Sequence, residues 1–244
     1  MVVPIVEGAA TALAGGALGA LTGSFVGLSV VGGVVGGLNG AISGWRGIYR
    51  WRHLGGWVAF VLDSTWAILM TVTALVAHLA AAMSPGRGGY VESLSRREDR
   101  HVYAGGFGLR PGFVITLGNT VNRAGPRVAR SERARRLVTD HEHVHVWQAR
   151  WLGPLYPLLY VLWSVVGAIV GVAVWTLRRR EQPIGRVIES CAYYLNPLEW
   201  WAYSRDDRWP PPGLVAGLGW RRPLVGPISR ASGRRPRGSA AARR

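Results

Sequence analysis

Residues 9–43 contain no charged side chain, and this stretch limits the possible folds more than any other feature of the chain. Glycine recurs every four residues in two series, one from Gly15 to Gly27 and one from Gly32 to Gly44. A four-residue step keeps the small residues on one helical face, so that two helix backbones can approach closely in lipid. The stretch is long for one membrane crossing of about 20 residues and short for two. It therefore predicts a glycine-zipper segment, either a tight helical hairpin broken near residues 27–29 or one tilted helix.

Two further apolar stretches favour an integral membrane protein. Residues 57–83 form the clearest predicted transmembrane helix, interrupted only by Asp63 and His78, which we expect to reach the interfaces near its ends. Residues 155–176 form the second apolar run, which three arginines end. Tryptophan and arginine alternate over residues 45–56, as in an interfacial belt.

The net charge of +16 comes from arginine alone, because the chain has no lysine. No nucleic-acid recognition motif accompanies the arginines, so we expect the excess to face anionic lipid headgroups and expect no nucleic-acid partner. Only three arginines precede residue 84. The positive-inside rule therefore predicts a multi-pass protein of the plasma membrane whose later part faces the cytoplasm. The single cysteine, Cys191, excludes an internal disulfide and a cysteine zinc site.

Residues 141–145 read His-Glu-His-Val-His, which matches the H-E-x-x-H pattern. Residues i and i+4 share a helical face, so His141 and His145 can bind one metal ion. Glu142 lies beside the first ligand and can act as general base on zinc-bound water. Residues 126–150 are predicted to be helical, with Pro126 in the first turn. The apolar, β-branched residues 113–117 before them predict a strand.

Catalytic zinc takes three protein ligands, so a third ligand must come from elsewhere. We favour Glu199, because a helix starting near Pro197 would place it in the first turn, with the small Ala202 allowing close packing. Glu189 is the main competitor. His143 points to another face of the helix and is a poor partner. The remaining candidates are His101 and Glu132.

The motif with Gln148, followed by Asn196-Pro197-x-Glu199-x-x-Ala202, resembles the zincin superfamily over roughly residues 90–207. It is closest to gluzincin-like metallopeptidases, whose third ligand is a glutamate on a downstream helix. The resemblance implies zinc ligands His141, His145 and Glu199, with Glu142 as the general base. It also implies that the strand before the motif helix can pair with an extended substrate.

The apolar run between the motif and Glu199 constrains the topology. If residues 155–176 simply crossed a membrane, His145 and Glu199 would lie on opposite sides and could not share a metal. Three arrangements avoid this: a re-entrant hairpin broken near Gly167 or Gly171, a buried helix of the catalytic domain, or a site at bilayer depth as in site-2-protease-like enzymes. We favour the first two, because the motif helix is too polar for lipid.

These observations predict a mainly α membrane protein with a small α+β zincin-like domain. Residues 1–83 would form the glycine-zipper and transmembrane region, residues 84–208 the zincin-like domain with its apolar helix or hairpin 155–176, and residues 209–244 a disordered Pro/Arg-rich tail. The predicted function is membrane-anchored, zinc-dependent hydrolysis of peptide or protein substrates. The alternatives are a metal-binding pseudoenzyme and a non-enzymatic glycine-zipper protein that forms a homo-oligomer or pore.

Several further residues are secondary candidates for the site. A tyrosine near Glu199 would donate a hydrogen bond to the oxyanion, and an aspartate would orient a zinc-bound imidazole. Gln148 lies on the same helical face as the two histidine ligands, one turn further on. The candidate oxyanion donors are Tyr193, Tyr194 and Tyr203, and the candidates that would orient an imidazole are Asp140 and Asp206.

Overall fold

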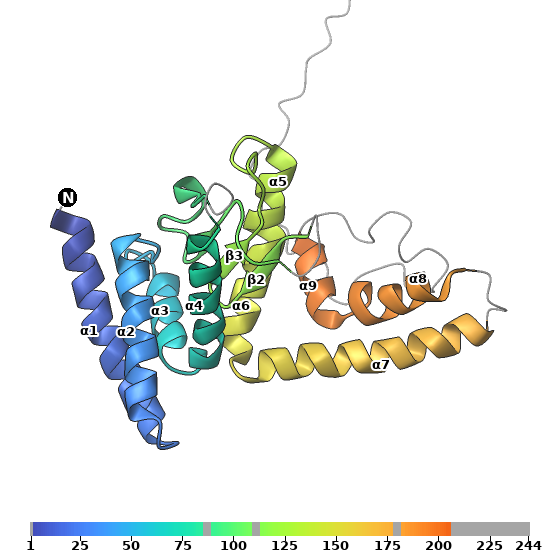
Figure 1. Cartoon of the computed structure of the whole chain (residues 1–244), viewed down its shortest axis with the longest axis horizontal. Helices are drawn as coiled ribbons and strands as arrows, with labels where there is room; N and C mark the ends of the chain where they lie inside the picture. Colours follow the sequence, from blue (N-terminus) through green and yellow to red (C-terminus); the bar gives the residue numbers. More distant parts are fainter. Residues whose placement is uncertain (1, 85–88, 109–112, 178–181, 206–244) are drawn as a thin grey trace, which may run out of the picture.

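The computed structural model describes residues 2–84, 89–108, 113–177 and 182–205. This part of the chain is mainly helical and contains one small three-stranded sheet, as predicted (Figure 1). The predicted tail over residues 209–244 and the candidate Asp206 lie outside the described residues.

The glycine-zipper segment folds into an antiparallel helical hairpin, which confirms that alternative over a single tilted helix. Helix α1 (Val2–Ser24) packs along α2 (Ser29–Trp45), and Gly27 turns the chain with a φ of +72°. The glycine faces meet directly: a Cβ added to Gly19 would lie 2.1 Å from the carbonyl oxygen of Gly32. The small residues are therefore used for packing inside the chain.

The predicted single transmembrane helix over residues 57–83 is wrong, because the chain bends there by 89°. Helix α3 (Leu54–Ser64) ends just after Asp63, and α4 (Ile68–Ala82) runs off in a new direction. The expectation that Asp63 and His78 reach the interfaces is also wrong, because both side chains are buried. Asp63 faces inward onto Arg150, whose guanidinium donates to both carboxylate oxygens at 2.8 Å.

A small sheet lies between the N-terminal helices and the C-terminal part of the described chain (Figure 1). Its strand order is β1-β3-β2, with β1 parallel and β2 antiparallel to β3, so β2 is an edge strand. The predicted strand at residues 113–117 is confirmed for its second part only. The sheet and the short helix before it comprise η1 (Glu92–Leu94), β1 (His101–Val102), β2 (Ile115–Leu117) and β3 (Thr120–Asn122).

The motif helix starts later than predicted. The chain is helical from Glu132, where the hydroxyl of Ser131 accepts a hydrogen bond from the Ala134 amide, and Pro126 lies in a turn before it. This helix is continuous through three segments: α5 (Glu132–Arg136), the π-helical η2 (Leu137–Glu142) and α6 (His143–Leu152). A π-helical turn rotates the side chains that follow it relative to a regular helix, and such turns are frequent at functional sites.

The second apolar run forms one unbroken helix, α7 (Leu155–Leu177), so the re-entrant hairpin broken near Gly167 or Gly171 is wrong. The buried-helix alternative is also wrong, because only these two glycines of α7 are buried. After α7 the chain returns beside it and reaches the motif helix again (Figure 1). The returning segments are α8 (Ile184–Glu189), the π-helical η3 (Ser190–Tyr194) and α9 (Pro197–Arg205).

The two glycines of α7 are the points where the returning segment comes closest. A Cβ on Gly167 would lie 2.5 Å from the Cys191 carbonyl oxygen, and one on Gly171 would lie 2.9 Å from the Cα of Ile188. Asn196 then starts α9 as predicted, since its side-chain oxygen accepts a hydrogen bond from the Leu198 amide. The chain that leaves the motif along α7 thus comes back to it.

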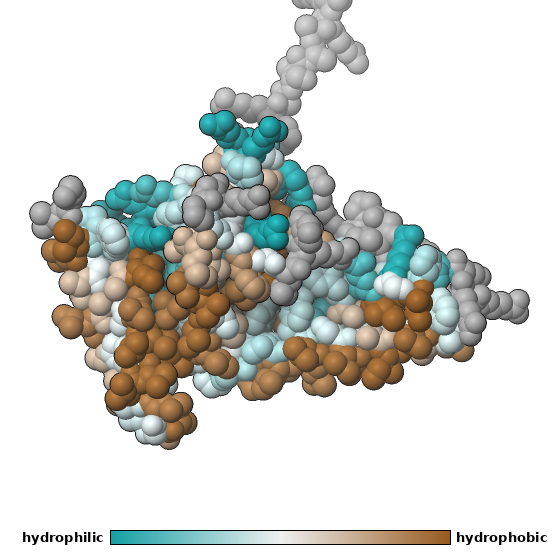
Figure 2. All heavy atoms as spheres, in the orientation of Figure 1, coloured by the Kyte–Doolittle hydropathy of each residue, from teal (hydrophilic) through white to brown (hydrophobic). Residues whose placement is uncertain are grey.

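Large apolar side chains cover much of the outer surface. Helices α1 and α7 are each long and apolar enough to cross a membrane, and the bent pair α3–α4 would count as a third span if taken together. Figure 2 shows hydrophobic side chains over the α1–α2 hairpin and along α7, whereas hydrophilic ones gather at the opposite edge of this view. On the face shown, the hydrophobic side chains lie mainly along the lower side of the molecule and the hydrophilic ones along the upper side.

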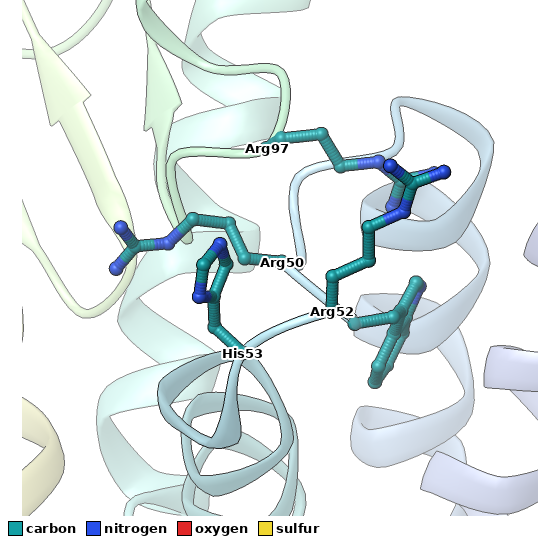
Figure 3. Close-up of a pocket in the computed structure, with 5 residues that line it drawn as sticks. Arg50, Arg52, His53 and Arg97 are labelled. Atoms are coloured by element: carbon teal, nitrogen blue, oxygen red, sulfur yellow. The ribbon is translucent and has the colours of Figure 1, made fainter.

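Arginine ion pairs connect the α1–α2 hairpin and the loop after it to the segment that follows η1. The loop between α2 and α3 supplies Arg50 and Arg52, and Arg97 reaches the same place from the segment after η1 (Figure 3). With Trp51 and His53, these residues line a cavity of about 490 Å³. Arg97 pairs with Glu7 of α1, and Arg50 pairs with the buried Asp99, so two of the three guanidiniums are held by carboxylates.

The helical hairpin leads to a first prediction, which compares two neighbouring glycines. In Gly36→Ala the new methyl group would lie 2.2 Å from the Gly15 carbonyl oxygen, whereas in Gly37→Ala it would meet nothing closer than 3.6 Å. Both variants gain the same helix propensity, so their difference isolates packing. We expect Gly36→Ala to be less stable than Gly37→Ala by about 1–3 kcal/mol. Thermal unfolding of the detergent-solubilised full chain measures this difference, and equal midpoints would contradict close packing of α1 and α2.

Candidate metal centre

His141, His145 and Glu199 lie together in a buried group, as the spacing of the motif and the choice of Glu199 predicted. The two imidazole Nε2 atoms are 3.3 Å apart. Oε2 of Glu199 lies 3.6 Å from the Nε2 of His141, and Oε1 lies 3.6 Å from the Nε2 of His145. The end of η2, the first turn of α6 and the first turn of α9 therefore place three ligand atoms around one point.

The distances in this group fit a single metal ion. Ligands 2.0–2.1 Å from a tetrahedral ion lie about 3.3–3.4 Å from one another, close to the separations of these three residues. Two of their buried polar atoms, Nδ1 of His141 and Oε2 of Glu199, have no hydrogen-bond partner in the described part of the chain. Two imidazoles and one carboxylate are a donor set that zinc accepts. The cluster can thus hold a metal ion.

Gln148 holds the His145 ring in the orientation that a ligand needs. Its amide nitrogen donates to the Leu198 carbonyl at 2.9 Å, so its oxygen faces Nδ1 of His145 at 2.8 Å. An Nδ1 that donates to this oxygen leaves the lone pair on Nε2, which faces the metal position. Gln148 also joins α6 to α9, because Leu198 immediately precedes Glu199. Gln148 was a secondary candidate, and the structure places its side chain against Nδ1 of His145, on the side of the ring away from the metal position.

Electrostatics within the cluster favour a charged pair when no metal is bound. Burial lowers the pKa of His145, but the facing Glu199 carboxylate outweighs burial and raises this pKa to about 9. Burial likewise raises the pKa of Glu199, yet the two imidazoles outweigh it and hold that pKa well below its usual range. At neutral pH the metal-free site therefore keeps a proton on His145 opposite an ionised Glu199.

Two tyrosines of α7 contact the ligands. The Tyr160 hydroxyl donates to Oε1 of Glu199 at 2.8 Å, and the Tyr156 hydroxyl lies 3.3 Å from Nδ1 of His145. Sequence analysis missed both, although their spacing of four residues at the start of an apolar helix puts them on one face. The first two turns of α7 thus form one wall of the site.

Glu142 is buried and lies in the same cavity as the three ligand candidates. The hydroxyl of Thr116, in the edge strand β2, donates to its Oε2 at 2.7 Å. This bond connects the motif helix to the sheet and fixes one carboxylate oxygen. The other oxygen, Oε1, is left for a further partner.

The secondary tyrosine candidates lie close to the cluster. The Tyr203 ring packs edge-on against the His141 ring, with 4.5 Å between the centroids, and Tyr194 lies next to Tyr203. Tyr193 lines the cavity. Burial raises the pKa values of Tyr193 and Tyr203 well above the ordinary value, so both hydroxyls stay protonated at neutral pH.

The other candidates are not brought into the ligand group. Asp140 accepts a hydrogen bond from its neighbour Thr139, and Glu189 lies on α8 outside the three-residue cluster. His143 faces Arg100 and Trp147, whereas His101 lies between Ser43 and Tyr90 in a separate buried network. Glu132 pairs with Arg136 on the surface.

The cavity at the cluster has a volume of about 470 Å³. Five segments that are far apart in sequence surround it: α4, β2 with the two residues before it, the motif helix, the first turns of α7, and the returning segment (Figure 1). The described residues therefore define a mainly helical protein with a buried histidine–carboxylate group that opens onto a cavity. No protein-family model, curated protein or solved structure matches the chain.

Removing a ligand leads to a second prediction. We expect His141→Ala, His145→Ala and Glu199→Ala each to weaken zinc binding by more than about 100-fold, because each removes a ligand atom from a three-residue site. His143→Ala is the matched control on the same helix and should keep one equivalent of zinc. Zinc is measured by elemental analysis after dialysis, and unchanged zinc in Glu199→Ala would exclude Glu199 as the third ligand.

The protonated His145 leads to a third prediction, on proton release. Zinc must displace the proton that His145 carries below its pKa of about 9. We expect His145 to release about one proton per zinc at pH 7.5, in addition to any proton lost by zinc-bound water, and this contribution to fall as the pH rises past 9. Titration calorimetry in two buffers of different ionisation enthalpy measures this number. Release of no proton at pH 7.5 would contradict the His145–Glu199 pair.

Proposed function

We propose that this protein is a membrane-anchored zinc metallopeptidase that hydrolyses peptide bonds. The observation that carries the proposal is that His141, His145 and Glu199 converge on one point in a cavity that also contains the Glu142 carboxylate. This set contains both a metal site and a base, which are the two components that zinc-dependent hydrolysis requires.

Zinc held by the three ligands would polarise a carbonyl group and lower the pKa of water to about 7. Glu142 then accepts the proton of the attacking water. Thr116 occupies Oε2 of this carboxylate and holds it in place, which leaves Oε1 to take the proton. The same carboxylate can afterwards pass the proton to the leaving amine.

The oxyanion that forms needs a hydrogen-bond donor from the protein. Tyr193 is the best candidate, because it lines the cavity and its raised pKa keeps the hydroxyl protonated. Tyr203 has the same protonation state and packs on the His141 ring. Tyr160 instead donates to Glu199 and so positions a ligand.

The edge strand β2 offers a place for an extended substrate. Among the described residues it pairs with β3 alone, and its residues Ile115–Leu117 line the cavity. A peptide can add to such an edge through main-chain hydrogen bonds. This arrangement supports the expectation from the zincin resemblance that the strand before the motif helix binds the substrate.

We further propose that the protein is a multi-pass protein of the plasma membrane, with the catalytic side in the cytoplasm. The apolar helices α1 and α7 support this location. The sequence requires that residues 155–176 do not separate His145 from Glu199, and the structure meets this requirement in a way that was not predicted. Since the chain that leaves along α7 returns beside it, α7 does not separate His145 from Glu199. The alternatives are a metal-binding pseudoenzyme and a glycine-zipper oligomer.

Replacing the proposed base leads to a fourth prediction. We expect Glu142→Gln to retain one equivalent of zinc but to lose about 10²–10⁴-fold in kcat, because an amide cannot accept the proton. Glu132→Gln, ten residues earlier on the same helical run and exposed, is the matched control and should keep full activity. Fluorogenic peptide hydrolysis by the zinc-loaded full chain measures both variants. Zinc binding without any hydrolysis in the wild-type chain would favour the pseudoenzyme.

A further inference from the structure

The lining of the metal-site cavity is apolar except at its chemical centre. Ten of the sixteen described lining residues are apolar or aromatic. The four ionisable residues other than tyrosine are the three ligand candidates and Glu142. The apolar and aromatic members are Met70, Phe113, Val114, Ile115, Leu117, Tyr156, Pro157, Tyr160, Val161 and Tyr193.

Arginine is absent from the described lining of this cavity although the chain as a whole is strongly basic. The sequence contains 29 arginines, yet none of the described residues around the cavity is an arginine. The two carboxylates present already have partners: Glu142 binds Thr116, and Glu199 faces two imidazoles and Tyr160. Apart from the candidate ligands and Glu142, a charged substrate side chain next to the cleaved bond would contact mainly apolar and aromatic side chains, which cannot replace its hydration.

The apolar wall of the cavity continues onto the exterior of α7. Val161 lines the cavity and is nevertheless 60% exposed. Leu158 and Leu162, which lie beside it on the same helix, are 64% and 61% exposed. These side chains extend the cavity wall into the hydrophobic surface along α7 in Figure 2. An apolar segment can therefore pass from that surface into the site without crossing a polar rim on this side.

We infer that the substrate is an extended polypeptide segment with bulky apolar side chains on both sides of the cleaved bond. This inference rests on the proposed peptidase function. It specifies the substrate by chemistry: leucine, isoleucine or phenylalanine next to the bond, as in a membrane-associated segment of another polypeptide. The β2 edge aligns the main chain, and the apolar wall selects the side chains.

A peptide pool tests the substrate class separately from the function. The zinc-loaded full chain in detergent micelles receives peptides of equal length whose two central residues are Leu, Phe, Ser, Glu or Arg. We expect kcat/KM to be at least about 100-fold higher for Leu or Phe than for Glu or Arg, because the apolar lining contacts the former favourably and cannot replace the hydration of the latter. Equal cleavage of all peptides would overturn the substrate class and leave the peptidase function standing. No cleavage of any peptide would overturn both.

A matched pair of variants tests whether the cavity wall sets this preference. Val161→Asp places a carboxylate in the lining, whereas Val172→Asp makes the same change on α7 outside it. We expect Val161→Asp to lower cleavage of the Leu peptide at least tenfold and to raise cleavage of the Arg peptide, with zinc content unchanged. Val172→Asp should keep the wild-type ratio.

A second substitution covers the case in which the aspartate variant does not fold. Val161→Trp keeps the wall apolar but narrows the cavity, so it should lower cleavage of the Phe peptide relative to the smaller Leu peptide. Unchanged ratios in every folded Val161 variant would overturn the assignment of this wall to substrate selection.

Discussion

The buried ion pair between Asp63 and Arg150 joins α3, which packs beside the α1–α2 hairpin, to the motif helix. Arg150 lies on the motif helix, and its guanidinium donates to both oxygens of Asp63 and to the Asp99 carbonyl. Both side chains are almost fully buried, so removing either one would leave an unpaired charge in the interior, which typically costs about 3–5 kcal/mol. The hydroxyl of Tyr49 and the amide of Asn119 complete the shell around Asp63. The bend between α3 and α4 begins directly after Asp63, next to this ion pair.

The helical hairpin and the metal centre are therefore not separate bodies joined by a linker. Asn39 of α2 accepts a hydrogen bond from Asn119, and Ser43 of the same helix bonds to His101 of β1. These contacts cross the predicted boundary at residue 83 and are buried on both sides. Asn39 and Ser43 directly precede Gly40 and Gly44, so they lie on a face of α2 that is adjacent to its glycine face. The apolar exterior and the polar interior are thus parts of one packing arrangement.

Features that depend on local spacing could be predicted from the sequence. The four-residue step of the glycines predicted a glycine-zipper segment, with the helical hairpin as one of two alternatives, and the i, i+4 spacing of His141 and His145 predicted two imidazoles on one face. Asn196 and Pro197 predicted the start of α9 and so the position of Glu199. Features that depend on distant contacts could not be predicted. The Asp63–Arg150 pair joins residues 87 positions apart, and Tyr160 reaches Glu199 only because the chain folds back beside α7.

The return of the chain beside α7 explains why the third ligand can follow an apolar helix. Gly167 and Gly171 remove side chains where the backbones of α7 and the returning segment approach most closely. Helix α7 and the returning segment thus lie side by side. Tyr156, near the start of α7, contacts His145, and the returning segment leads to Glu199. The outer face of this pair remains apolar, whereas its inner end supplies a ligand and two tyrosines. This part of the chain therefore places an apolar surface next to the candidate metal ligands, which is the arrangement that the proposed peptidase would need for apolar substrates.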